Sequence, residues 1–156
     1  MKPITIVMIE DSQEFADALK KVLAEQKKFP CEVIVLNPDR PELPTFEQFH
    51  DEIQSHLRGF RNLVLMDKQL GKWKWTGAHL APSFHKLVAI STDEMPWAEF
   101  NFTGKAMIAF HNKEDAKTAF VETILKAIEQ FMPSEIIQEL VEYQRAYRGN
   151  GSEVIT

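Results

Sequence analysis

The chain has 156 residues, of which 44% are hydrophobic and 26% are charged, and its formal net charge is −5. This length fits one ordinary domain with a real core, and the composition excludes a disordered or collagen-like chain. The negative charge gives no electrostatic basis for nucleic-acid binding, and no apolar run approaches the roughly 20 residues that cross a bilayer. We therefore expect a cytoplasmic domain that binds neither nucleic acid nor membrane.

Apolar runs along the chain predict five strands. Residues 4–9 are rich in β-branched side chains and almost wholly apolar, which is typical of a central strand buried on both faces. The same pattern returns in four later segments, residues 33–36, 62–67, 87–91 and 106–110.

Segments with helical spacing of apolar residues separate these runs. One follows Ser12, and a second starts at Thr45, with Gln48 placed to complete a capping box. A third, before the fourth strand, is cut short by Pro82. Strands that alternate with helices predict a parallel sheet covered on both faces, the α/β class.

The last part of the sequence predicts two more helices. Residues 116–131 form a clear amphipathic pattern, and Ser134 can cap a further helix that carries an apolar stripe. We therefore divide the chain into a domain over residues 1–132 and a C-terminal helix with a polar tail over residues 133–156.

Polar and charged residues stand at or just beyond the ends of the predicted strands: Glu10, Asp11, Asp67, Ser91 and Lys113. In an open parallel sheet these ends meet at one edge, where ligands bind. Clustered carboxylates repel one another unless a divalent cation holds them, and oxygen ligands suit Mg²⁺. With the metal bound, Asp67 can attack a phosphoryl donor while Lys113 and Ser91 neutralise the transferred group.

In type and order, these residues resemble those of the receiver domains of two-component signalling. The match comprises the acidic pair Glu10 and Asp11, Asp67 at the end of its apolar run, Ser91, and Lys113. The resemblance extends over about residues 4–131. We accordingly predict a doubly wound, five-stranded parallel sheet of the flavodoxin-like kind, in the order 2-1-3-4-5, with an added C-terminal helix.

The resemblance also implies a function. A histidine kinase or phosphotransfer protein would donate a phosphoryl group to Asp67 in a Mg²⁺-dependent step, and Ser91 and Phe110 would form the switch. The implied metal ligands are Glu10, Asp11, Asp67 and the backbone carbonyl of Gln69. The chain would then not be an enzyme, beyond Mg²⁺-dependent phosphorylation and dephosphorylation of itself. Its output would pass to an unknown partner or to a second copy, with the apolar stripe of the last helix as one route.

Three alternatives stay open. A degenerate receiver that binds a partner without phosphorylation is favoured by Thr92, because the family usually has a smaller residue there. A phosphohydrolase of the haloacid-dehalogenase type needs a second aspartate two residues after the first, where this chain has Gln69. A flavodoxin needs a phosphate-binding loop after the first strand, where Glu10 and Asp11 would repel phosphate.

Overall fold

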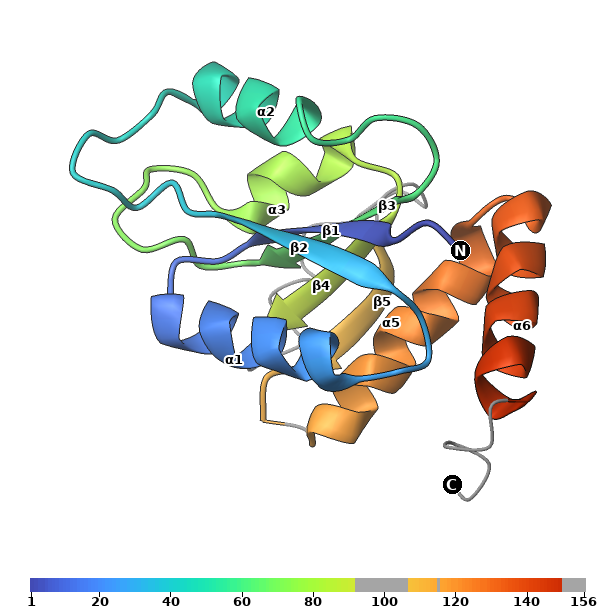
Figure 1. The fold of residues 1–156 in the computed structure, drawn as a ribbon. Helices are drawn as coiled ribbons and strands as arrows, with labels where there is room; N and C mark the ends of the chain where they lie inside the picture. Colours follow the sequence, from blue (N-terminus) through green and yellow to red (C-terminus); the bar gives the residue numbers. More distant parts are fainter. Residues whose placement is uncertain (92–106, 115, 150–156) are drawn as a thin grey trace.

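A parallel sheet forms the centre of the computed structural model, which describes residues 1–91, 107–114 and 116–149 (Figure 1). The strands are β1 Ile4–Ile9, β2 Cys31–Leu36, β3 Asn62–Asp67, β4 Leu87–Ser91 and β5 Met107–Asn112. Their order is β2-β1-β3-β4-β5, and every pairing is parallel. The predicted α/β class and the order of the first four strands are confirmed, and the described backbone of β5 lies beside β4.

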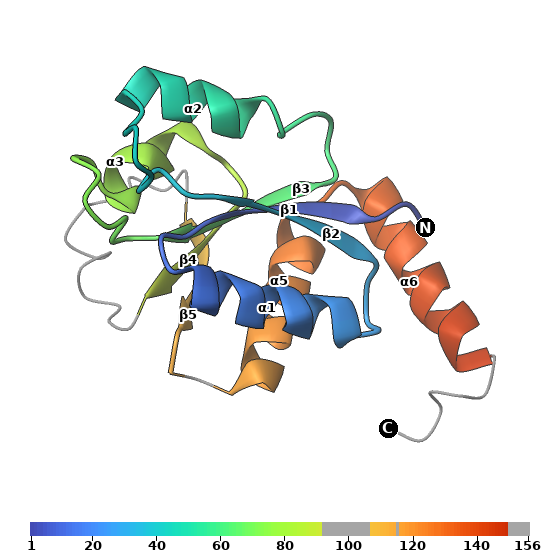
Figure 2. The ribbon, with the colours of Figure 1, turned by 60° about the vertical axis from the view of Figure 1, so that its left-hand side comes forward.

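Helices cover both faces of the sheet. They are α1 Gln13–Glu25, α2 Phe46–Gln54, α3 Gly77–Leu80 with a 3₁₀ turn over Ala81–Ser83, α5 Lys117–Phe131 and α6 Ser134–Gly149. Figure 2 shows α1 and α5 on one side of the sheet and α2 and α3 on the other. In the described part of the chain, no helix combines the length and the apolarity needed to span a membrane.

Alternation along the strands divides the core between the two faces. Ile6 and Met8 point into the cluster shared with α1 and α5, whereas Val7 and Ile9 point into the cluster shared with α2 and α3. All four are fully buried, as expected of a strand in the middle of a sheet that is covered twice.

Local signals explain two of the helix starts. Ser12 is the N-cap of α1, and its hydroxyl accepts a hydrogen bond from the backbone N–H of Phe15. Thr45 and Gln48 form the predicted capping box at the start of α2. The helix before β4 is only four residues long, in agreement with the interruption expected at Pro82.

The final helix packs onto the domain. Ile136 and Leu140 are buried in the same cluster as α1 and α5, and Figure 1 shows α6 beside α5. Glu139 forms an ion pair with Arg61, the residue before β3. Ile136 and Leu140 of the predicted apolar stripe are therefore used within the chain, and self-association through the rest of the stripe stays a prediction.

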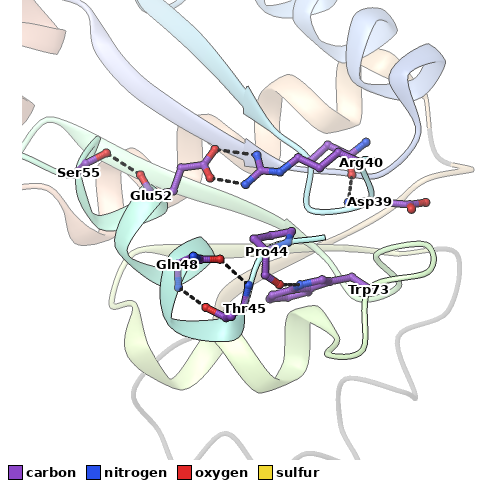
Figure 3. Close-up of polar contacts among 9 residues, drawn as sticks. Asp39, Arg40, Pro44, Thr45, Gln48, Glu52, Ser55 and Trp73 are labelled. Carbon is purple, nitrogen blue, oxygen red and sulfur yellow. Dashed lines mark hydrogen bonds and ion pairs between the residues drawn. The ribbon is translucent and has the colours of Figure 1, made fainter. Parts of the chain in front are cut away.

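Trp73 joins the loop after β3 to the loop before α2. The centroid of its ring lies 5.0 Å from that of Phe49, and its indole Nε1 donates to the backbone carbonyl of Pro44 at 2.8 Å (Figure 3).

We expect Trp73→Phe to lower the free energy of unfolding by about 2 kcal/mol, since it removes a buried hydrogen bond and leaves a cavity. Urea denaturation checks this. Trp75→Phe is the control, because Trp75 is only half-buried. An equal loss of unfolding free energy in both variants would contradict the role of Trp73 in joining the two loops.

Candidate functional site

The carboxyl ends of β1 and β3 bring the predicted acidic residues together. Ile9 pairs with Met66 in the sheet. Glu10, which directly follows β1, and Asp67, the last residue of β3, are therefore neighbours. Among the described residues, one carboxylate oxygen from each of Glu10, Asp11 and Asp67 lies within 4.8 Å of the others. Glu10 and Asp67 are buried, and Asp11 is half-buried. Three oxygens converge at a partly covered site at the edge of the sheet.

Lys113 supplies the positive charge of this cluster. It directly follows β5, which continues to Asn112 and so ends two residues later than the sequence predicts. Its Nζ lies 2.9 Å from Asp67 Oδ2 and 3.0 Å from Glu10 Oε2. The ammonium also lies 4.4 Å from the ring centroid of Phe15, where a cation–π interaction adds to the two ion pairs.

The two oxygens of Glu10 have different surroundings. Oε1 accepts from the backbone N–H of Ser12 at 3.1 Å and from Lys113 Nζ at 3.3 Å. Oε2 is fully buried and receives no hydrogen bond from the described residues, because the nearby ammonium does not have hydrogen-bond geometry toward it. A buried oxygen that pairs with an ammonium but accepts no hydrogen bond favours an additional cation or water. The donor set, all oxygen, fits Mg²⁺.

Burial dominates the electrostatics of the carboxylates. It raises the pKa of Glu10 to about 8, with a further contribution from the charge of Asp67. Burial also raises the pKa of Asp67, although Lys113 opposes the shift. Burial lowers the pKa of Lys113, but the hydrogen bond and charge of Asp67 and the charge of Glu10 outweigh it, so the net direction is upward. The lysine therefore stays charged at neutral pH.

The backbone places other predicted residues near the same edge. Asp67 pairs with Ile90, and the next residue, Ser91, pairs with Asn112, which precedes Lys113. The predicted switch position Phe110 pairs with Ala89, further from the edge. Gln69 follows the end of β3 by two residues, and its side chain is exposed. Thr92 lies outside the described residues, as do the side chains of Ser91 and Phe110.

Sequence reasoning missed Gly77, the first residue of α3. Its backbone N–H donates to the carbonyl of Lys68 at 2.7 Å, and a Cβ atom built on it would lie 2.0 Å from the backbone oxygen of Asp67. Only a residue without a side chain permits this approach to the end of β3. The available signal was a glycine at a helical position, where most residues form helix better.

Comparisons with solved structures support the fold. No protein-family model matches the sequence, and no curated protein sequence matches it. Solved structures do. A signal receiver domain from Vibrio parahaemolyticus superposes with a TM-score of 0.62 at 14% identity, over 90% of this chain and 98% of that one. This chain has the receiver fold.

Two further structures support the assignment of the receiver fold. The N-terminal domain of a response regulator/sensory box/GGDEF protein from Carboxydothermus hydrogenoformans gives a TM-score of 0.60 at 18% identity, over 80% of this chain and 94% of that one. A CheY-like receiver domain protein from Methanospirillum hungatei gives 0.56 at 16% identity, over 93% and 99%. At these identities the likeness concerns the fold, and the site must be argued from its own residues.

Proposed function

We propose that this protein is a phosphoacceptor switch of a two-component phosphorelay, with Asp67 as the residue that accepts the phosphoryl group. The observation that carries the proposal is the cluster at the end of β3. Oxygens of Glu10, Asp11 and Asp67 lie within 4.8 Å of one another, and the ammonium of Lys113 lies 2.9 Å from Asp67. Acids and one fixed cation stand together at the ligand-binding edge of a receiver fold.

Each residue has a distinct task in this proposal. Mg²⁺ held by Glu10, Asp11, Asp67 and the backbone carbonyl of Gln69 would neutralise charge on the phosphoryl oxygens. A carboxylate oxygen of Asp67 attacks phosphorus, the bond from phosphorus to the donor breaks, and the donor group leaves with the electron pair. Lys113 then pairs with the new acyl phosphate.

The signalling step follows from the added negative charge. Ser91 turns toward the phosphoryl group, and Phe110 on β5 follows, so phosphorylation shifts an equilibrium between two states of the domain. The donor is a histidine kinase or phosphotransfer protein in the cytoplasm. The output passes to a protein partner or a second copy, and the only chemistry of the chain is its own phosphorylation and dephosphorylation.

Incubation with phosphoramidate and Mg²⁺ tests the proposal. Intact-mass analysis should show one adduct of about 80 Da, the mass that a phosphoryl group adds. Asp67→Asn should abolish it, whereas Asp51→Asn, which changes an aspartate that is 84% exposed, should not. An adduct that survives in Asp67→Asn would rule out the assigned acceptor. Mg²⁺ binding without labelling of the parent protein would favour a protein-binding module of receiver fold.

Removing one acid from the cluster should weaken the metal site. We expect Asp11→Asn to raise the dissociation constant of Mg²⁺ at least about tenfold, because metal affinity already falls by that factor when only a partner of a ligand is lost. Calorimetric titration measures it. Asp17→Asn, on the exposed side of α1, is the control. Equal affinities of the parent and Asp11→Asn would exclude Asp11 from the site.

A further inference from the structure

Asn37 links the candidate metal site to the loop after β2. Its side-chain Nδ2 donates to the backbone carbonyl of Asp11 at 3.3 Å, and its Oδ1 accepts from the backbone N–H of Asp39 at 2.8 Å. The backbone N–H of Glu10 also donates to the carbonyl of Leu36 at 3.2 Å. The backbones of both acidic residues are thus held at the end of β2, since the Glu10 N–H donates to Leu36 and the Asp11 carbonyl accepts from Asn37.

The loop that carries Asn37 is itself fixed at its far end. Figure 3 shows Arg40 and Glu52 in a bidentate ion pair, at 3.2 and 2.8 Å, and the Trp73 indole bonded to the carbonyl of Pro44. A residue can set the position of another only if it is held in place. Asn37 meets this condition, because the loop is tied both to α2 and to the segment after β3.

A second contact joins this loop to the segment after Asp67. A Cβ atom on Gly71 would lie 2.0 Å from Asp39 Oδ2, so the side chain of Asp39 lies directly against Gly71. Gly71 has a φ of +65°, which a residue with a side chain rarely adopts. The loop after β2 therefore touches both segments that carry the proposed metal ligands.

We infer that Asn37 is a positioning residue, which fixes the backbone at Asp11 and thereby the direction of its carboxylate. The inference rests on the proposed metal-dependent function. Mg²⁺ requires near-ideal octahedral geometry, whereas Ca²⁺ tolerates irregular oxygen ligands. A group that sets the direction of one ligand should therefore affect Mg²⁺ more than Ca²⁺.

The test compares the two ions on folded protein. Asn37→Ala should raise the dissociation constant of Mg²⁺ about tenfold and that of Ca²⁺ by less than about threefold. Asn37→Ser keeps a short acceptor for the N–H of Asp39 but does not reach Asp11. It should shift the ratio of the Mg²⁺ affinity to the Ca²⁺ affinity in the same direction. Asn62→Ala is the matched control, since Asn62 Nδ2 bonds the carbonyls of Arg58 and Gly59 at the opposite end of β3.

The possible outcomes separate the inference from the proposed function. A parent protein that binds neither ion defeats the proposed metal site and this inference together. A parent that binds Mg²⁺, with an unchanged Mg²⁺ to Ca²⁺ ratio in both Asn37 variants, overturns the inference alone. Loss of the near-UV circular dichroism of both Asn37 variants would assign Asn37 to the fold and also overturn it. A similar shift of the Mg²⁺ to Ca²⁺ affinity ratio in Asn62→Ala would show that any loss of stability changes the ratio, and would also overturn the inference.

Discussion

Glu10→Gln should stabilise the protein at pH 8.5 in the absence of divalent cations, and should change its stability little at pH 5. Burial raises the pKa of Glu10 to about 8, so a folded chain at high pH carries an ionised carboxylate that the interior disfavours. Glutamine has the same shape and no charge. We expect a gain of roughly 2–4 kcal/mol at pH 8.5, which corresponds to about 5–10 °C in melting temperature.

The sign follows from proton binding. Below about pH 4.5, Glu10 is protonated in both the folded and the unfolded chain. As the pH rises toward about 8, the unfolded chain releases this proton while the folded chain keeps it, so the free energy of unfolding falls across this window. Asp67 has a pKa shifted in the same direction and adds to the decline.

Melting curves from pH 5 to pH 8.5 in a chelator measure this effect. Glu14→Gln removes an exposed acid in the first turn of α1, and should keep the pH dependence of the parent. An equally steep decline in Glu10→Gln and in the parent would show that Glu10 ionises freely in the folded state. Mg²⁺ should reduce the difference in stability between Glu10→Gln and the parent at pH 8.5, because the cation favours the ionised carboxylate.

Gly77→Ala should destabilise the protein by about 3 kcal/mol or more. The new methyl group would meet the backbone oxygen of Asp67 at 2.0 Å and the side chain of Met66 at 2.9 Å. A backbone oxygen at the end of a central strand cannot turn aside as a flexible side chain does. Either α3 or the end of β3 must move, and Asp67 moves with it.

Gly59→Ala provides the contrast for this substitution. Gly59 has a φ of +72° but open space around it, so alanine there meets only backbone strain, about 1–2 kcal/mol. Gly77 lies in a helix, where alanine is normally preferred by about 1 kcal/mol. Urea denaturation of both variants shows whether the steric contact at Gly77 costs more stability than the backbone strain at Gly59. A smaller loss in Gly77→Ala than in Gly59→Ala would contradict the close approach.

The α/β class and the grouping of Glu10 with Asp67 follow from sequence pattern because both depend on local rules, whereas the resemblance to receiver domains supplies the order of the strands. Apolar runs give buried strands, and parallel strands bring their ends to one edge, so Glu10 and Asp67 could be placed together before any coordinates. The bond from Asn37 to Asp11 joins residues 26 positions apart, and depends on how two loops meet. The contact between Gly77 and Asp67 likewise depends on the separation of two backbones, which periodicity does not encode.

The tryptophan pair in the loop after β3 gives the protein a built-in optical probe. The chain has three tryptophans, and the ring centroids of Trp73 and Trp75 lie only 5.2 Å apart in the segment that follows Asp67. Trp73 is 5% exposed, so its emission should be blue-shifted and sensitive to small displacements of that segment. Intrinsic fluorescence should therefore report the proposed cation binding and phosphoryl transfer in real time, with no label attached and no residue replaced.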